Sequence, residues 1–213
     1  IINDAPIYFD AAQTGSKAWE PKNFDGKFGG PIRMRVALAQ SKNLASIRIL
    51  QAIGPRYAQD YIARFGFDSN RHPPYLPMAL GAGSVTPLQM ASGYAIFANG
   101  GYKVEPYFIE RVEDDKGNIV QQVDPLVAGQ NATQIIDPRN AFLMNSMMQD
   151  VIQRGTATAA KQLKRNDLAG KTGTTSNFID AWFCGYQKDL ITISWVGFDE
   201  PKSLGKNETG GKV

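Results

Sequence analysis

The sequence predicts an α+β fold in which an antiparallel sheet packs against a helical lobe. Segments with helical periodicity recur between residues 32 and 163, and strand-like segments follow between residues 169 and 198. The composition, with 43% hydrophobic and 20% charged residues, is that of an ordinary globular protein. Because 213 residues are enough to bury one sizeable core, we expect a single domain over residues 1–213.

The segment before the first helix is expected to be mostly loop. Residues 1–30 lack helical periodicity, and Ile7-Tyr8-Phe9 is the one candidate for a short strand. Pro31 is expected at the first position of a helix, where its missing N–H does no harm. The short polar sequence Ser41-Lys42-Asn43 then separates this helix from the next. Serine and asparagine compete for backbone hydrogen bonds, so the residues alone favour helix capping as their role.

The expected helices carry apolar residues at a spacing of three or four positions, and most have a start or stop signal. Thr86-Pro87-Leu88-Gln89 is a capping box, with threonine as the cap and glutamine at the third helical position. Gly66 ends one helix, and Asp137-Pro138 opens the longest one. In chain order, we expect helices over residues 32–40, 44–53, 56–65, 87–97 and 138–152, and a short alanine-rich helix that ends at Leu163.

The strands are expected in two groups. Residues 102–123 have the pattern of a β-hairpin around the charged turn 114–118, which we expect to lie at the periphery. Three later strands are expected to form a meander: one that starts at Ala169, one over residues 181–186 and one over residues 190–198.

The strand that starts at Ala169 has the composition of a ligand-binding edge. Its threonines favour a half-buried strand, and its glycines mark a place where another group approaches the backbone. Thr172 and Thr174 lie two residues apart and leave the same face, while Lys171 adds a compact positive charge. We expect the two hydroxyls and the ammonium to share one surface. Such a surface suits a carboxylate, and a free strand edge suits an extended peptide.

Two other interpretations of this strand were weighed. Gly170-Lys171-Thr172 also ends a phosphate-binding loop pattern, but Arg165 stands where that pattern needs a glycine, so we exclude it. A plain surface strand with a solvated lysine remains open, because a Lys-Thr-Gly triplet alone is weakly informative.

Composition excludes several kinds of protein. The net charge of +3 is too small to indicate a nucleic-acid partner. With one cysteine, Cys184, and one histidine, His72, a disulfide framework is excluded, and neither a metal site nor a cofactor is expected. We expect Cys184 to be an inert buried thiol and His72 to be a surface residue. The sequence holds no run of about 18 apolar residues, and we expect no signal peptide within it.

Two motifs and their flanks resemble a known family. Ser41-Lys42-Asn43 and Lys171-Thr172-Gly173 resemble the second and third motifs of the penicillin-recognising serine enzymes. The longer segments resemble the transpeptidase domain of class A penicillin-binding proteins, the bifunctional peptidoglycan synthases, over nearly the whole chain. These segments are GGPIRMRVALAQSKNLASIRIL, LGAGSVTPLQMASGYAIFANGG, RGTATAAKQL, DLAGKTGTTSNFIDAWFCGY and ISWVGFDEP. The resemblance implies a β-lactamase/transpeptidase-like fold.

The first motif of that family, Ser-x-x-Lys, is missing from its expected place before Ser41. Only Ser203-Leu204-Gly205-Lys206 has this spacing, in a glycine-rich tail without helical periodicity, and we treat it as a coincidence. We therefore expect the nucleophilic serine to lie outside this chain. The same holds for the glycosyltransferase domain and membrane anchor that class A members carry. Both ends of the sequence are expected to be cuts within a longer protein.

The resemblance implies a D,D-transpeptidase at the extracytoplasmic face of the bacterial inner membrane. Its substrates would be peptidoglycan stem peptides ending in D-Ala–D-Ala, β-lactams would acylate it, and cell-wall synthesis proteins are possible partners. Ser41 would relay a proton, Asn43 would hold a substrate amide, and Lys171 would attract the substrate carboxylate. The implied catalytic residues are Ser41, Asn43, Lys171 and Thr174, and the implied substrate-binding residues are Thr172, Gly173 and Thr174.

Three functions stay open at this point. The first is the D,D-transpeptidase itself. The second is a relative with different chemistry, namely a D,D-carboxypeptidase or a β-lactamase. The third is a non-catalytic penicillin sensor or assembly scaffold.

Overall fold

A computed structural model describes residues 1–14 and 16–212; Gly15 and Val213 belong to the expected domain range but lie outside the described residues. The α-helices are α1 (Ala11–Thr14), α2 (Met34–Ala39), α3 (Asn43–Ile53), α4 (Pro55–Ala63), α5 (Pro87–Ala98) and α6 (Pro138–Arg154). The strands are β1 (Ile2–Asp4), β2 (Gly30–Ile32), β3 (Tyr102–Lys103), β4 (Arg111–Glu113), β5 (Ile119–Gln122), β6 (Thr133–Gln134), β7 (Ala169–Thr174), β8 (Ala181–Gln187) and β9 (Leu190–Val196). This arrangement confirms the α+β class.

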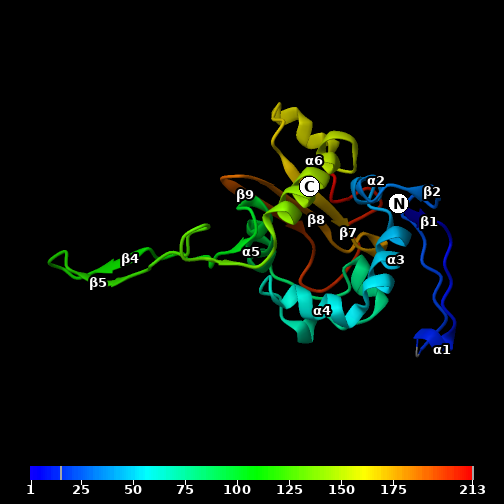
Figure 1. Ribbon diagram of the computed structural model, residues 1–213, viewed down its shortest axis with the longest axis horizontal. Coiled ribbons are helices and arrows are strands. Elements are labelled where there is room, and N and C mark those ends of the chain that lie inside the picture. Colours follow the sequence, from blue (N-terminus) through cyan, green and yellow to red (C-terminus); the bar gives the residue numbers. More distant parts are fainter. Residues whose placement is uncertain (15, 213) are drawn as a thin grey trace.

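The central element is the antiparallel sheet β7–β8–β9, with β7 at one edge as expected. Helices α5 and α6 pack against it (Figure 1). The apolar stripe of α6 supplies Met148, Val151 and Ile152 to the core, and Met148 contacts Tyr186 of β8. The sheet is therefore held from one side by a long helix whose periodicity is visible in the sequence.

Helix α2 is fastened to α6 at both of its ends. Arg35 donates to the Ser146 carbonyl oxygen at 2.9 Å and to the Asp150 carboxylate at 2.8 Å. At the end of α6, a Cβ on Gly155 would lie 2.1 Å from the Ala39 carbonyl oxygen, so only glycine permits this approach. These contacts bring the residues after α2 beside the residues after α6.

The start of the chain differs from the prediction. Pro31 lies in β2, opposite Asn3 of β1, and the helix begins later, at Met34. Proline is tolerated in this two-stranded sheet because it needs no ladder hydrogen bond at an edge. The strand expected at Ile7-Tyr8-Phe9 is reduced to a single bridge between Phe9 and Trp19, whose rings stack at 5.5 Å.

The middle of the chain agrees with the prediction from the sequence more closely than the start does. The capping box is confirmed, since Thr86 Oγ1 accepts from the Gln89 N–H and the Gln89 side chain accepts from the Thr86 N–H. Strands β4 and β5 form the expected hairpin, which extends as an arm away from the rest of the molecule (Figure 1). The alanine-rich segment forms 3-10 rather than α-helical turns, over Thr158–Leu163.

One residue expected at the surface is buried. His72 is 9% exposed and meets the ring of Phe67 edge to face, at 5.7 Å between ring centroids. The short 3-10 turn Ser69–Arg71, which the sequence did not predict, folds the histidine inward.

Two properties of residues 1–14 and 16–212 bear on function. Within that part of the chain, every helix is too short or too polar to cross a bilayer. The same residues bring together no group of three or more histidine, cysteine, aspartate or glutamate side chains suited to a metal ion.

Candidate functional site

The site is built on the corner between α2 and α3. The N–H of Ser41 donates to the Leu38 carbonyl at 3.1 Å, and the N–H of Lys42 donates to the Ala37 carbonyl at 2.9 Å. This pair of bonds is the Schellman motif, which needs a left-handed residue just after the helix and usually has glycine there. Ser41 occupies that position with φ = 53°. The left-handed conformation costs a non-glycine residue roughly 1–2 kcal/mol, so surrounding contacts must hold it.

Lys171 reaches this corner from the sheet. Its Nζ donates to Ser41 Oγ at 2.7 Å and to the Thr172 carbonyl at 2.9 Å. The structure thus brings together two residues that are 130 positions apart in the sequence. The contact joins the helical lobe to the edge strand of the sheet.

The lysine and the threonines do not share a face of β7. Lys171 pairs with the buried Cys184, so these two side chains lie on the core face of the sheet. Thr172 and Thr174 alternate with Lys171 and leave the opposite face. The expectation of one surface with two hydroxyls and an ammonium is therefore wrong, and the ammonium meets the site from beneath the strand.

Burial changes the proton affinity of both core-facing groups. Desolvation lowers the pKa of Lys171 from 10.5 to about 8. Desolvation also raises the pKa of Cys184 to about 11, which keeps the thiol protonated at neutral pH. Cys184 is thus the inert thiol that the sequence predicted, whereas Lys171 loses its proton closer to neutral pH than an exposed lysine does.

A groove of about 560 Å³ lies between the helical lobe and β7. Five of the predicted site residues are close to it: Ser41, Asn43, Thr172 and Thr174 line it, and Lys171 contacts Ser41 at its wall. The other lining residues are Asn23, Phe24, Asp25, Gln40, Lys42, Arg154, Gly155, Thr156, Thr209 and Gly211. Predicted Gly173 lies between the two threonines of the strand.

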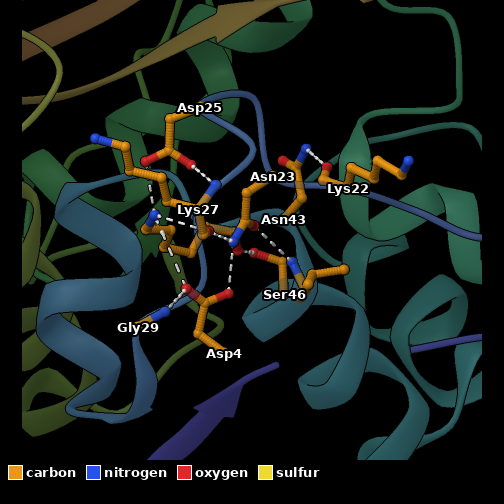
Figure 2. A network of polar contacts seen from close by, with 10 residues as sticks. Asp4, Lys22, Asn23, Asp25, Lys27, Gly29, Asn43 and Ser46 are labelled. Atoms are coloured by element: carbon orange, nitrogen blue, oxygen red, sulfur yellow. Dashed lines mark hydrogen bonds and ion pairs between the residues drawn. The ribbon is translucent and has the colours of Figure 1, made fainter. Parts of the chain in front are cut away.

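Asn43 and Ser41 are not helix caps. The N-cap of α3 is Lys42, whose side chain makes no capping hydrogen bond. Asn43 Nδ2 donates instead to the Lys22 carbonyl at 2.9 Å (Figure 2). The capping interpretation that the residues alone favoured is therefore wrong for both side chains.

Sequence reasoning missed two residues that orient the threonines. The hydroxyls of Thr156 and Thr172 are 2.5 Å apart, and the N–H of Gly210 donates to Thr174 Oγ1 at 3.1 Å. Because Gly210 occupies an acceptor position of the Thr174 oxygen, the hydroxyl hydrogen is directed elsewhere. Thr156 lies in the segment RGTATAAKQL that resembles the family, but nothing in that segment assigned it a role, and nothing singled out Gly210.

The arrangement can bind an anion but shows no nucleophile of the expected kind. A half-buried cation and two oriented hydroxyls suit a carboxylate at the groove. The Ser203 hydroxyl donates to the Asn177 carbonyl at 2.8 Å, and Ser203 lies outside the helices of the described chain. The Ser-x-x-Lys spacing at Ser203 therefore has no helical geometry behind it.

Comparison with known proteins identifies relatives over the whole chain. The family profile described as "Penicillin binding protein transpeptidase domain" matches residues 1–207. Penicillin-binding protein 1A of Neisseria flavescens is 52% identical over 213 residues, which are 100% of this chain and 27% of that protein. Penicillin-binding protein 1A of Pseudomonas aeruginosa is 42% identical over 258 residues, covering 100% of this chain and 31% of that protein.

The solved structures agree. The crystal structure of penicillin-binding protein 1A from Haemophilus influenzae superposes with a TM-score of 0.94 at 35% identity, over 99% of this chain and 36% of that one. This match confirms the expected transpeptidase-like fold. The chain spans only 27% of the length of the Neisseria flavescens relative, so the family match alone does not establish the activity of a whole protein.

The pKa of Lys171 yields a testable prediction. In an NMR titration with labelled lysine, one side-chain signal should titrate at about pH 8 and should vanish in Lys171→Arg, because burial disfavours the ammonium. The folded pKa is below the unfolded value of 10.5, so the unfolded chain binds more protons between the two. This group's contribution to stability should thus rise as pH increases across that window. A Lys171 signal that titrates near 10.5 would contradict the burial argument.

Proposed function

The chain belongs to the penicillin-binding protein transpeptidase family, and from this premise we propose that it is part of a D,D-transpeptidase that cross-links peptidoglycan stem peptides. In this proposal residues 1–213 form part of one such domain, and β-lactams acylate the enzyme as substrate mimics. The family membership supports the reaction class, and the geometry of the groove supports the residue roles below.

One observation carries the proposal. The hydrogen bond of 2.7 Å between Lys171 Nζ and Ser41 Oγ joins the second and third motifs at the wall of a single groove. A proton relay needs its groups within hydrogen-bond reach, and these two groups meet that condition without any rearrangement.

The reaction is acyl transfer in two steps. A serine hydroxyl, contributed by a segment outside residues 1–213, attacks the carbonyl carbon between the two terminal D-alanines of a stem peptide. The new ester bond forms as the C–N bond breaks, and the serine proton passes through Ser41 to the departing D-alanine amine. The amine of a second stem peptide then attacks the ester, which forms the cross-link amide and restores the serine.

Ser41 is suited to relay this proton because of its partner. A serine at its ordinary pKa is a poor base, but a neighbouring lysine with a lowered pKa is able to give and take a proton near neutral pH. Burial lowers the pKa of Lys171 to about 8, which brings it close to the working range.

The threonines and Lys171 bind the substrate's terminal carboxylate in this proposal. Thr172 and Thr174 line the groove, and Thr156 and Gly210 hold their oxygens in place. Lys171 supplies positive charge from beneath the strand, where low local polarity strengthens its field. Gly173 lets the peptide backbone approach β7 closely.

The oxyanion that develops during the attack and the substrate amide both need hydrogen-bond donors. The backbone N–H of Thr174 on the edge strand would supply one oxyanion donor, and the N–H of the nucleophilic serine the other. Loss of one such donor typically slows a reaction by about 100-fold to 1,000-fold. Asn43 lines the groove opposite the strand and carries both a donor and an acceptor for a substrate amide.

Location follows from the substrate. Peptidoglycan lies outside the cytoplasmic membrane, so we propose that the protein acts at the extracytoplasmic face of the bacterial inner membrane. A segment outside residues 1–213 would anchor it there, near other proteins of cell-wall synthesis.

The test uses the full-length protein. Fluorescent penicillin should label it covalently, and incubation with stem peptides should give cross-linked dimers. Labelling with release of D-alanine alone would instead indicate a carboxypeptidase. Rapid turnover of the penicillin would indicate a β-lactamase, and labelling without either reaction would indicate a penicillin sensor. A protein that is neither labelled nor active would contradict the proposal.

Lys171→Ala should slow acylation of the full-length protein strongly while the fold is kept. The variant removes the partner of Ser41 and the positive charge at the groove. Lys188→Ala is the matched control, because the Lys188 side chain is 83% exposed on a turn of the same sheet. Stopped-flow labelling with fluorescent penicillin gives the acylation rate constant of each variant. Equal acylation rate constants for Lys171→Ala and wild type would count against the assigned role.

Residues 1–213 produced alone should form no covalent adduct with penicillin. Ser203 is the only serine with a lysine three residues later, and its segment is not helical. Circular dichroism would first establish that the produced chain is folded, and intact-mass spectrometry would then look for the adduct. A stable acyl adduct on Ser41 would refute its assignment as a relay.

A further inference from the structure

We propose that Asp4, Asn23 and Lys42 form a buried clamp that positions Ser41 and Asn43 for the reaction. Here the clamp means the side chains of these three residues, which act as positioning residues through the backbone; Asn23 and Lys42 also line the groove. The role assigned to Ser41 and Asn43 rests on the proposed function, whereas the clamp itself is read from the contacts below.

The corner that carries Ser41 needs outside support. Ser41 adopts the left-handed conformation at a position where glycine is usual, and it is followed by a helix without a side-chain cap of its own. Both features leave the corner dependent on contacts from other segments. These contacts come from the segment between β1 and β2.

Asn23 supplies the missing cap from that loop. Its Oδ1 accepts from the N–H of Leu44, in the first turn of α3, at 3.2 Å. Its Nδ2 donates to Asp4 Oδ1 and to the Lys27 carbonyl, each at 2.7 Å (Figure 2). A side-chain oxygen on a first-turn N–H is what an N-cap residue normally provides. Asn23 performs this task from 21 residues away and is itself 4% exposed.

Asp4 and Lys42 bring opposite charges into the same place. The Asp4 side chain is fully buried, and its Oδ2 accepts from the N–H of Gly29 at 2.9 Å. Lys42 Nζ lies 3.8 Å from that oxygen and 2.8 Å from the carboxylate of Asp25. Its carbonyl oxygen also accepts from Ser46 Oγ at 3.2 Å, inside α3.

These contacts act on the reactive residues through the backbone. Lys42 stands between Ser41 and Asn43, and all three residues line the groove, so fixing its side chain fixes the stretch of backbone that carries the other two. A buried carboxylate without partners is strongly disfavoured, so conformations that withdraw Lys42 or Asn23 from Asp4 are suppressed. Asn43 is also held directly, through the Lys22 carbonyl of the same loop.

The test compares Asp4→Asn, Asn23→Ala and Lys42→Met with wild type in the full-length protein. Asp167→Asn is the control, because it removes a half-exposed carboxylate whose partner is Arg165, and neither of these described residues lines the groove. Two quantities are measured with fluorescent penicillin: the second-order acylation rate constant and the final labelled fraction. Lys42→Met keeps the apolar stem of the side chain, which protects the test if Asp4→Asn fails to fold.

For each clamp variant, the rate constant should fall by about 10-fold to 100-fold while the final labelled fraction stays complete, as small misplacements of reactive groups do. The double variant Asp4→Asn/Lys42→Met should lose no more than the worse single variant, because the two residues act as one unit. A merely structural role would lower the labelled fraction and leave the rate constant of folded molecules unchanged. That result, or losses that multiply in the double variant, would overturn the proposal.

Amide hydrogen exchange over residues 41–46 separates this inference from the proposed function. In Asn23→Ala the Leu44 amide loses its acceptor, and exchange there should become faster. If wild type is not labelled by penicillin, the proposed function fails, and exchange still reports on the clamp. Unchanged exchange in all three variants would show that no clamp exists.

Discussion

The candidate site depends on one contact between the helical lobe and the sheet, the hydrogen bond from Lys171 to Ser41. Each partner is held in a state that its own segment does not favour. Ser41 is left-handed at a glycine position, and Lys171 is a half-buried cation on the core face of a sheet. Such local conflicts are expected at functional sites, because residues there are selected for chemistry rather than for local preference. The same contact therefore joins two segments of the fold and places two candidate site residues side by side.

Features that depend on neighbouring residues were predictable from the sequence. The capping box at Thr86, the β4–β5 hairpin and the edge position of β7 each follow from short patterns, and all three are present. Features set by a distant partner were not. Pro31 has the signal of a helix start, yet pairing with β1 places it in a strand, and His72 is buried by a turn that no pattern announced.

The same distinction applies to the site. Ser41, Asn43, Lys171 and Thr172 belong to motifs and Thr174 directly follows one, so a resemblance was enough to nominate them. Thr156 and Gly210 contact the threonines of β7, and Asn23 contacts the start of a helix 21 residues away. No spacing rule links such residues, because the chain brings them together only after the core has formed. The residues that shape the groove are therefore harder to predict from the sequence than the motif residues at its centre.

The close approach of Gly155 to Ala39 sets the width of the groove. Ser41 follows the end of α2, and Thr156 follows Gly155, so the two walls meet where a methyl group would not fit. Any larger residue at position 155 would act as a wedge and move one wall away from the other. The spacing between Ser41 and Thr156 across the groove is therefore set by the absence of a side chain at position 155.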